Sequence, residues 1–176
     1  MYKRQGLGTD GALWNNSNDI FREMKGICLL HTLSSGVRTL SHREALRMAT
    51  LGGAAVFGLD HITGSIRVGK RADLILVDTR SAHMRPLRLG SHENVSSSLV
   101  YNATGADVSD SIIGGRLVMR DRTVLTMNEA ALLEQAQRAS EEILSRCLKD
   151  GVLPEDHMAA LLKQAEEQPE GRPLSG

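Results

Sequence analysis

The chain has 176 residues, of which 41% are hydrophobic and 24% are charged, and its 21 basic residues balance its 21 acidic ones. This composition is typical of a globular protein, but a complete β/α barrel needs about 250 residues and does not fit. The zero net charge means that no excess of basic residues favours nucleic acid or an anionic membrane as a partner. No apolar stretch approaches the ~18 residues of a transmembrane helix, and Met1–Gln5 lacks the apolar segment of a signal peptide. We therefore expect a cytoplasmic protein with neither nucleic acid nor membrane as a partner.

The N-terminal residues place an acidic side chain where a strand gives way to a loop. Asp10 follows the apolar-glycine step Gly6-Leu7 and precedes a polar loop, and a helix is predicted over 18–33. This is where β/α barrels place catalytic carboxylates. We interpret the chain as the C-terminal part of a larger enzyme that carries one of its catalytic residues. The simpler alternative is that Asp10 caps the helix that follows; Asn15 and Asn16 could line a pocket, but we favour helix capping for them.

A second helix is predicted to begin after Ser41. The pattern Ser41-His42-Arg43-Glu44 is a capping box, and the helix that it opens extends to about Gly52 or Phe57. The glycine and alanine residues at 52–55 indicate close approach to another element.

The periodicity then changes from helical to strand-like. Residues 64–124 predict an antiparallel-rich sheet of about five short strands, with turns at Gly114-Gly115 and at Asp121-Arg122. Residues 74–78 are apolar on both faces, as in a buried strand. Without further strands, apolar residues such as Ile75 and Val77 would be left uncovered. The individual predictions are a short strand and turn at 64–73, strands at 74–78 and 98–102, an irregular linker at 79–95 and a hairpin over 108–124.

Helical periodicity returns over 128–149. We expect this helix to pack on its own barrel, with dimerisation as the alternative. A shorter helix is predicted from 154 or 155 to about 167, and a frayed tail follows it. The two cysteines, Cys28 and Cys147, are predicted to be reduced packing residues.

An ordered set of segments resembles the amidohydrolase superfamily, most closely its methylthioadenosine/S-adenosylhomocysteine deaminases and triazine chlorohydrolases. The N-terminal loop, the helix after it and the glycine-marked strands all carry the resemblance, which spans roughly residues 6 to 127. The most specific stretch runs from Gly64-Ser65-Ile66 to Ala72-Asp73-Leu74-Ile75. The matching segments are 7–11, 15–16, 21–25, 45–50, 64–76, 99–101, 107–108 and 114–118.

The resemblance implies an α/β fold: the C-terminal remnant of a metal-dependent β/α barrel, part of a small flanking β-sandwich, and trailing α-helices. On this basis, residues 1–57 hold the last barrel strand and the helices after it. Residues 58–127 hold the C-terminal part of the sandwich, residues 128–168 the C-terminal helices, and residues 169–176 a flexible tail.

The resemblance also implies a function. The parent enzyme would bind one divalent metal ion, expected to be zinc, with Asp10 as metal ligand and catalytic proton acceptor. None of the six histidines lies in a family ligand context. The expected activity is hydrolysis of carbon–nitrogen bonds other than peptide bonds, with deamination of a purine nucleoside derivative or related aminated heterocycle. The alternatives are hydrolytic dechlorination of a heterocycle, or a non-catalytic binding or assembly module. The intact enzyme could be a homo-oligomer, and we expect this chain alone to be inactive.

Overall fold

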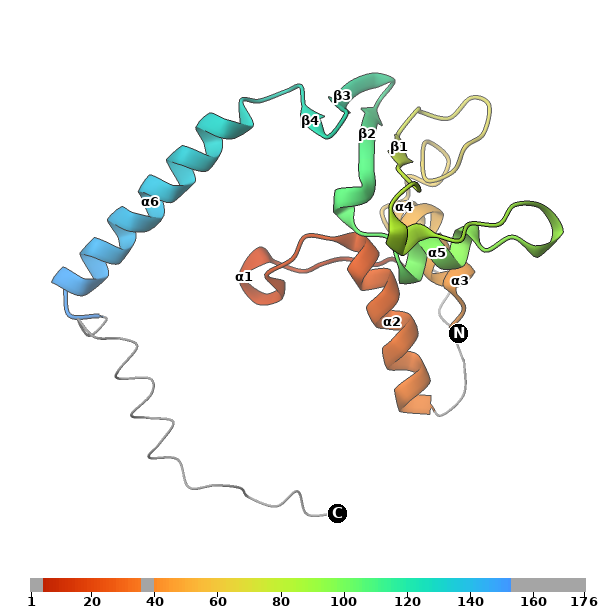
Figure 1. Ribbon diagram of the computed structural model, residues 1–176, viewed down its shortest axis with the longest axis horizontal. Coiled ribbons are helices and arrows are strands. Elements are labelled where there is room, and N and C mark those ends of the chain that lie inside the picture. Colours follow the sequence, from red (N-terminus) through yellow and green to blue (C-terminus); the bar gives the residue numbers. More distant parts are fainter. Residues whose placement is uncertain (1–4, 36–39, 153–176) are drawn as a thin grey trace, which may run out of the picture. The chain divides into compact units, whose positions relative to one another are not determined.

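The computed structural model describes residues 5–35 and 40–152 (Figure 1). The chain divides into two compact units, Met1–Thr126 and Met127–Gly176. The first holds a group of helices and a small sheet, and the second holds α6 (Glu129–Lys149). No helix in the described residues is long and apolar enough to cross a bilayer.

The helices of the first unit pack around a small core. They are α1 (Ala12–Asn15), α2 (Ile20–Ser35), α3 (His42–Arg47), a π-helical turn (Met48–Gly52), α4 (Gly53–Val56) and α5 (Val95–Tyr101). Helices α2, α3 and α5 contact one another. The i, i+3, i+7 spacing of Phe21, Met24 and Cys28 places these three residues on one face of α2. That face is buried against Ala45, Met84, Val100 and Ala103.

Two helix starts are fixed by side chains. Oδ1 of Asp19 accepts a hydrogen bond of 2.9 Å from the Phe21 N–H at the start of α2. The predicted capping box is present at α3, where Ser41 and Glu44 each accept a bond from the other's backbone N–H. The predicted helices over 18–33 and after Ser41 are therefore confirmed.

The sheet is antiparallel in the order β1-β2-β3-β4. Its strands are β1 (Leu74–Val77), β2 (Val108–Ile113), β3 (Arg116–Arg120) and β4 (Thr123–Val124). Gly114 and Gly115, with φ of 58° and 79°, form the predicted two-residue turn between β2 and β3. The second predicted turn is also present, since Asp121 and Arg122 have φ of 47° and 63°. The predicted hairpin is confirmed, but the sheet has four strands rather than about five.

Residues 64–73 form a loop, so the short strand predicted there is wrong. Lys70 Nζ donates to the carbonyl oxygens of Asp60 and Thr63 and to Oγ of Ser65. These bonds close the loop on itself, which takes the segment away from a β-ladder.

Residues 98–102 were expected to form a strand, but most of them belong to α5. The Ser98 N–H donates to the Asn94 carbonyl oxygen over 2.8 Å, and Val100 is fully buried. Helical geometry lets Val100 reach the core beside α2 and α3, so tertiary packing overrides the β-propensity of Leu99-Val100-Tyr101.

β1 is not buried on both faces as predicted. Ile75 and Leu76 are 54% and 50% exposed. The prediction of uncovered residues is correct for Ile75, whereas Val77 is half-buried and packs against the core. Residues 79–95 are mainly irregular, with 3₁₀ turns at Ala82–Met84 and Gly90–His92.

In the second unit, the predicted helix over 128–149 is confirmed as α6. Asn128 Oδ1 accepts a bond of 3.1 Å from the Ala131 N–H and caps the helix. The predicted helix from 154 or 155 to 167, and the tail after it, lie outside the described residues. Cys28 and Cys147 are both free, and Cys28 is buried as a packing residue.

Candidate functional site

Asp10 lies in an exposed turn at the end of an extended segment. Residues 5–11 have no strand partner among the described residues, so the predicted last barrel strand is an unpaired segment. Asp10 has φ of 60°, a left-handed conformation that Asp tolerates better than most residues. Its Oδ1 accepts a bond of 2.8 Å from the Gly11 N–H. This bond leaves Oδ2 without a hydrogen bond from any described residue.

Asn15 fixes the backbone beside Asp10. Its side-chain nitrogen donates to the Thr9 carbonyl oxygen over 2.7 Å and to Oε1 of Glu23 over 2.8 Å. Both bonds are partly shielded from water. The residue before Asp10 is therefore tied, through Asn15, to the first turn of α2.

The capping role predicted for Asn15 and Asn16 is wrong for α2, because Asp19 caps that helix. Asn16 ends α1 with φ of 56°. Sequence reasoning missed α1 because it is a single turn. Glu23, whose bond to Asn15 no local pattern predicts, is half-buried.

Glycines bring the Asp10 segment directly onto the π-helical turn. A Cβ at Gly52 would lie 2.5 Å from the Gln5 carbonyl oxygen, and one at Gly6 would lie 2.9 Å from Cα of Gly53. No side chain larger than hydrogen fits between these backbones. The close approach predicted for residues 52–55 is thus correct, and its partner is the extended segment that leads to Asp10.

Asp10 is the residue to which the family resemblance assigns the role of metal ligand. A catalytic zinc site normally uses three protein ligands from His, Asp, Glu or Cys. Within residues 5–35 and 40–152, no three such side chains are close enough together to hold a metal ion. The described residues therefore do not form a three-ligand metal site on their own.

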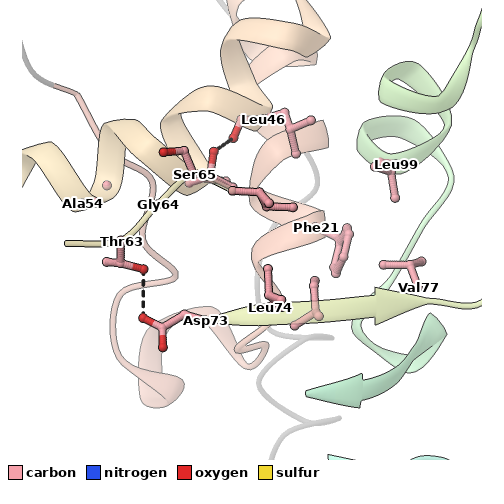
Figure 2. Close-up of a pocket in the computed structure, with 15 residues that line it drawn as sticks. Phe21, Leu46, Ala54, Thr63, Gly64, Ser65, Asp73, Leu74, Val77 and Leu99 are labelled. Atoms are coloured by element: carbon pink, nitrogen blue, oxygen red, sulfur yellow. Dashed lines mark hydrogen bonds between the residues drawn. The ribbon is translucent and has the colours of Figure 1, made fainter. Parts of the chain in front are cut away.

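A second feature is an apolar groove between β1 and the helices. Figure 2 shows Phe21, Leu46, Leu74 and Leu99 gathered around it. The groove has a volume of about 600 Å³ and is lined by residues of α2, α3, the π-helical turn, α4, the 63–66 loop, β1 and α5. Its lining suits apolar side chains rather than acid–base chemistry. The hydrophobic periodicity of the sequence did not predict this groove, because several separate elements form it.

Asp73 lies at the edge of this groove, with its side chain bound to three groups. Oδ2 accepts from Oγ1 of Thr63 over 2.8 Å (Figure 2), and Oδ1 accepts from the Gly114 N–H over 2.7 Å. The Arg71 side chain also donates to the carboxylate. These bonds, Arg71 first, lower the pKa of Asp73 to about 2. The ionised carboxylate is therefore a structural acceptor that joins the loop to the β2–β3 turn.

Asp107 holds a second polar network. Nε2 of His83 lies 3.0 Å from each carboxylate oxygen, and the Thr104 N–H donates to Oδ2 over 2.8 Å. Burial by itself raises the pKa of Asp107, but the bonds from Thr104 and His83 outweigh it and hold that pKa below its ordinary value. The pairing anchors the irregular segment that contains His83 to the start of β2.

Residues 3–118 match the model of the Amidohydrolase family. This chain belongs to that family. It is 42% identical to the 5'-deoxyadenosine deaminase of Methanosarcina mazei over 141 residues. It is 44% identical to the 5-methylthioadenosine/S-adenosylhomocysteine deaminase of Halobacterium salinarum over the same length. Each alignment covers 80% of this chain and 31% of the relative, so the chain spans about a third of the length of these curated proteins.

Solved structures show the same relationship. A zinc-bound adenosine deaminase from Xanthomonas campestris superposes with a TM-score of 0.73 at 35% identity, covering 80% of this chain and 31% of that one. The atrazine chlorohydrolase of Arthrobacter aurescens, complexed with zinc, superposes with a TM-score of 0.65 at 20% identity, covering 76% and 29%. The second likeness concerns the fold alone. The predicted resemblance to this family, and hence to an enzyme, is confirmed.

Proposed function

We propose that this chain is the C-terminal part of an amidohydrolase-family deaminase that releases ammonia from a purine nucleoside derivative or a related aminated heterocycle. The observation that carries the proposal is the 42–44% identity to enzymes named as deaminases of adenosine derivatives, over 80% of the chain. Dechlorination is the weaker alternative, because the chlorohydrolase shares only 20% identity. A non-catalytic assembly module remains the alternative from another class.

Within this proposal, Asp10 is one of the metal-binding residues and the proton acceptor of the assembled enzyme. Its Oδ1 is held by the Gly11 N–H, and the backbone before it is held by Asn15. A carboxylate fixed in this way loses little conformational freedom when it binds a ligand. The expected metal is zinc. The other residues that bind it would come from elsewhere in the assembled enzyme.

The proposal predicts that the 176-residue chain alone releases no ammonia from adenosine derivatives. One carboxylate is fewer than the three protein ligands of a catalytic zinc site. The matching region of the Methanosarcina mazei deaminase can be replaced by residues 5–126 of this chain. We expect the folded chimera to release ammonia.

Asp10→Asn in the chimera should then remove most of the activity, because the neutral amide is a weak metal ligand and cannot accept the proton. Asp60→Asn, which changes an exposed carboxylate in a loop, is the matched control and should leave the rate unchanged. Turnover by the 176-residue chain would contradict the need for the rest of the barrel. A folded but inactive chimera would contradict the proposed function, and an active Asp10→Asn chimera would contradict the role of Asp10.

A further inference from the structure

Helix α6 carries an apolar stripe that no described residue of its own unit covers. The stripe includes four large aliphatic residues, which are 50–63% exposed, and α6 has no buried residue. At 100° per residue, its members lie within one face of the helix. We define the α6 stripe as Leu132, Leu133, Ala136, Ala139, Ser140, Ile143, Leu144 and Cys147.

The order of large and small residues along the α6 stripe is nearly the same from the N-terminal end of the helix as from its C-terminal end. Large residues stand at both ends, and small ones stand between them. Positions 133, 136, 140, 143 and 147 alternate steps of three and four, the spacing of a coiled-coil seam. In an antiparallel pair centred on position 138, Leu133 meets Ile143 of the second copy, and Ala136 meets Ser140. Each large residue then packs on a large one, while the small residues let the helices approach closely at the centre.

The charges at the two ends of α6 decide between antiparallel and parallel pairing. Glu129 lies in the first turn, and Arg146 and Lys149 lie in the last. Antiparallel pairing places Glu129 of each copy beside the basic turn of the other and also opposes the two helix dipoles. Parallel pairing would place like charges together. Arg138 lies about 200° around the helix from Ala136, on the opposite face. The Arg138 side chains of the two copies therefore do not meet, although the helix pair is centred on this position.

We propose that α6 is a self-association surface that pairs antiparallel with α6 of a second copy of this chain. The charge complementarity and the reversible layout of the stripe identify the partner as a second copy. The proposal does not depend on the deaminase activity.

The direction of pairing is tested by disulfide trapping in the full chain. Glu129→Cys places a thiol opposite Cys147 of the second copy. Within one helix these positions are about 27 Å apart, far beyond the ~7 Å limit for Cα atoms in a disulfide. A bond between positions 129 and 147 therefore reports an intermolecular pair. Under mild oxidation we expect this bond in most of the cross-linked dimer, identified by peptide mapping.

Arg138→Cys, on the opposite face, is the matched control and should give at least tenfold less cross-linking to Cys147. Dimers joined only between the two Cys147 residues would indicate parallel pairing and would overturn the proposal.

Self-association itself is tested by sedimentation equilibrium of the reduced chain. We expect the average mass to rise towards that of a dimer with increasing concentration. Leu133→Glu combined with Ile143→Glu should abolish this rise, whereas Ser145→Glu, on the opposite face, should not. A chain that stays monomeric, or a dimer that tolerates the paired substitution, would mean that α6 is not the surface. If the chain is monomeric and the Cys147 thiol of the stripe is protected from a thiol-labelling reagent, the stripe packs within its own chain and the proposal is wrong.

Discussion

Asn15 and Glu23, eight residues apart, are joined by a hydrogen bond of 2.8 Å, and the same amide nitrogen donates to Thr9 over 2.7 Å. One side chain thus connects the α2 helix to the residue before Asp10. Two hydrogen bonds therefore hold the left-handed turn at Asp10: the one from Asn15 to the Thr9 carbonyl oxygen, and the one from the Gly11 N–H to the Asp10 side chain.

Asn15→Asp should destabilise the first unit by about 1–3 kcal/mol, because both donors are lost and two acceptors are left unpaired. It also places a carboxylate against that of Glu23. Asn16→Asp is the matched control, since Asp also tolerates its left-handed conformation and its side chain is exposed. Urea denaturation compares the two. Adding Glu23→Gln to Asn15→Asp should restore part of the loss, and equal midpoints for the two single variants would show that the bridge is unimportant.

Gly52→Ala and Gly26→Ala should have opposite effects. The new methyl group at Gly52 would lie 2.5 Å from the Gln5 carbonyl oxygen, and we expect a cost of about 1–3 kcal/mol. At Gly26, inside α2, a Cβ meets nothing within 4 Å. There, alanine should stabilise the helix by about 0.5–1 kcal/mol. Thermal melting of both variants measures the difference, and a tolerated Gly52→Ala would contradict the close contact between the Asp10 segment and the π-helical turn.

Asp73 should contribute to stability at neutral pH and lose that contribution in acid. Its folded pKa of about 2 lies below the ordinary value of 3.8, so the folded state favours the ionised form. The contribution is full above the ordinary pKa and disappears as the pH falls through the folded pKa. The stability difference between the native chain and Asp73→Asn should therefore shrink between about pH 4 and pH 2, as followed by urea midpoints.

Asp60→Asn provides the control for this experiment, because the exposed Asp60 carboxylate makes no hydrogen bond to a described residue. Its stability difference from the native chain should not show the same loss. If the stability difference between the native chain and Asp73→Asn stays constant down to pH 2, the three hydrogen bonds to Asp73 do not stabilise the fold.

Ser41→Ala should destabilise the chain by about 1 kcal/mol, since it removes the capping box of α3. Ser96→Ala makes the same chemical change at a buried hydroxyl that has no hydrogen-bond partner among the described residues. Removing that hydroxyl should be neutral or stabilising. Differential scanning calorimetry orders the two variants, and the reverse order would contradict both assignments.

The sequence by itself determined the elements whose signals are local. The capping box at Ser41 and Glu44, the glycine turn at 114–115 and the periodicity of α6 depend on neighbouring residues, so they could be predicted and were found. Asp10 was singled out by its family context, and the close approach at residues 52–55 by its glycines.

Tertiary structure decided the rest, because distant partners outweigh local preference. Leu99-Val100-Tyr101 has the composition of a strand, yet burial of Val100 beside α2 and α3 makes it helical. The 64–73 segment has a strand-like period, but the Lys70 ammonium group closes it into a loop. The Asn15 bridge and the groove beside β1 depend on which groups meet across a turn or between elements, and a one-dimensional pattern does not record those meetings.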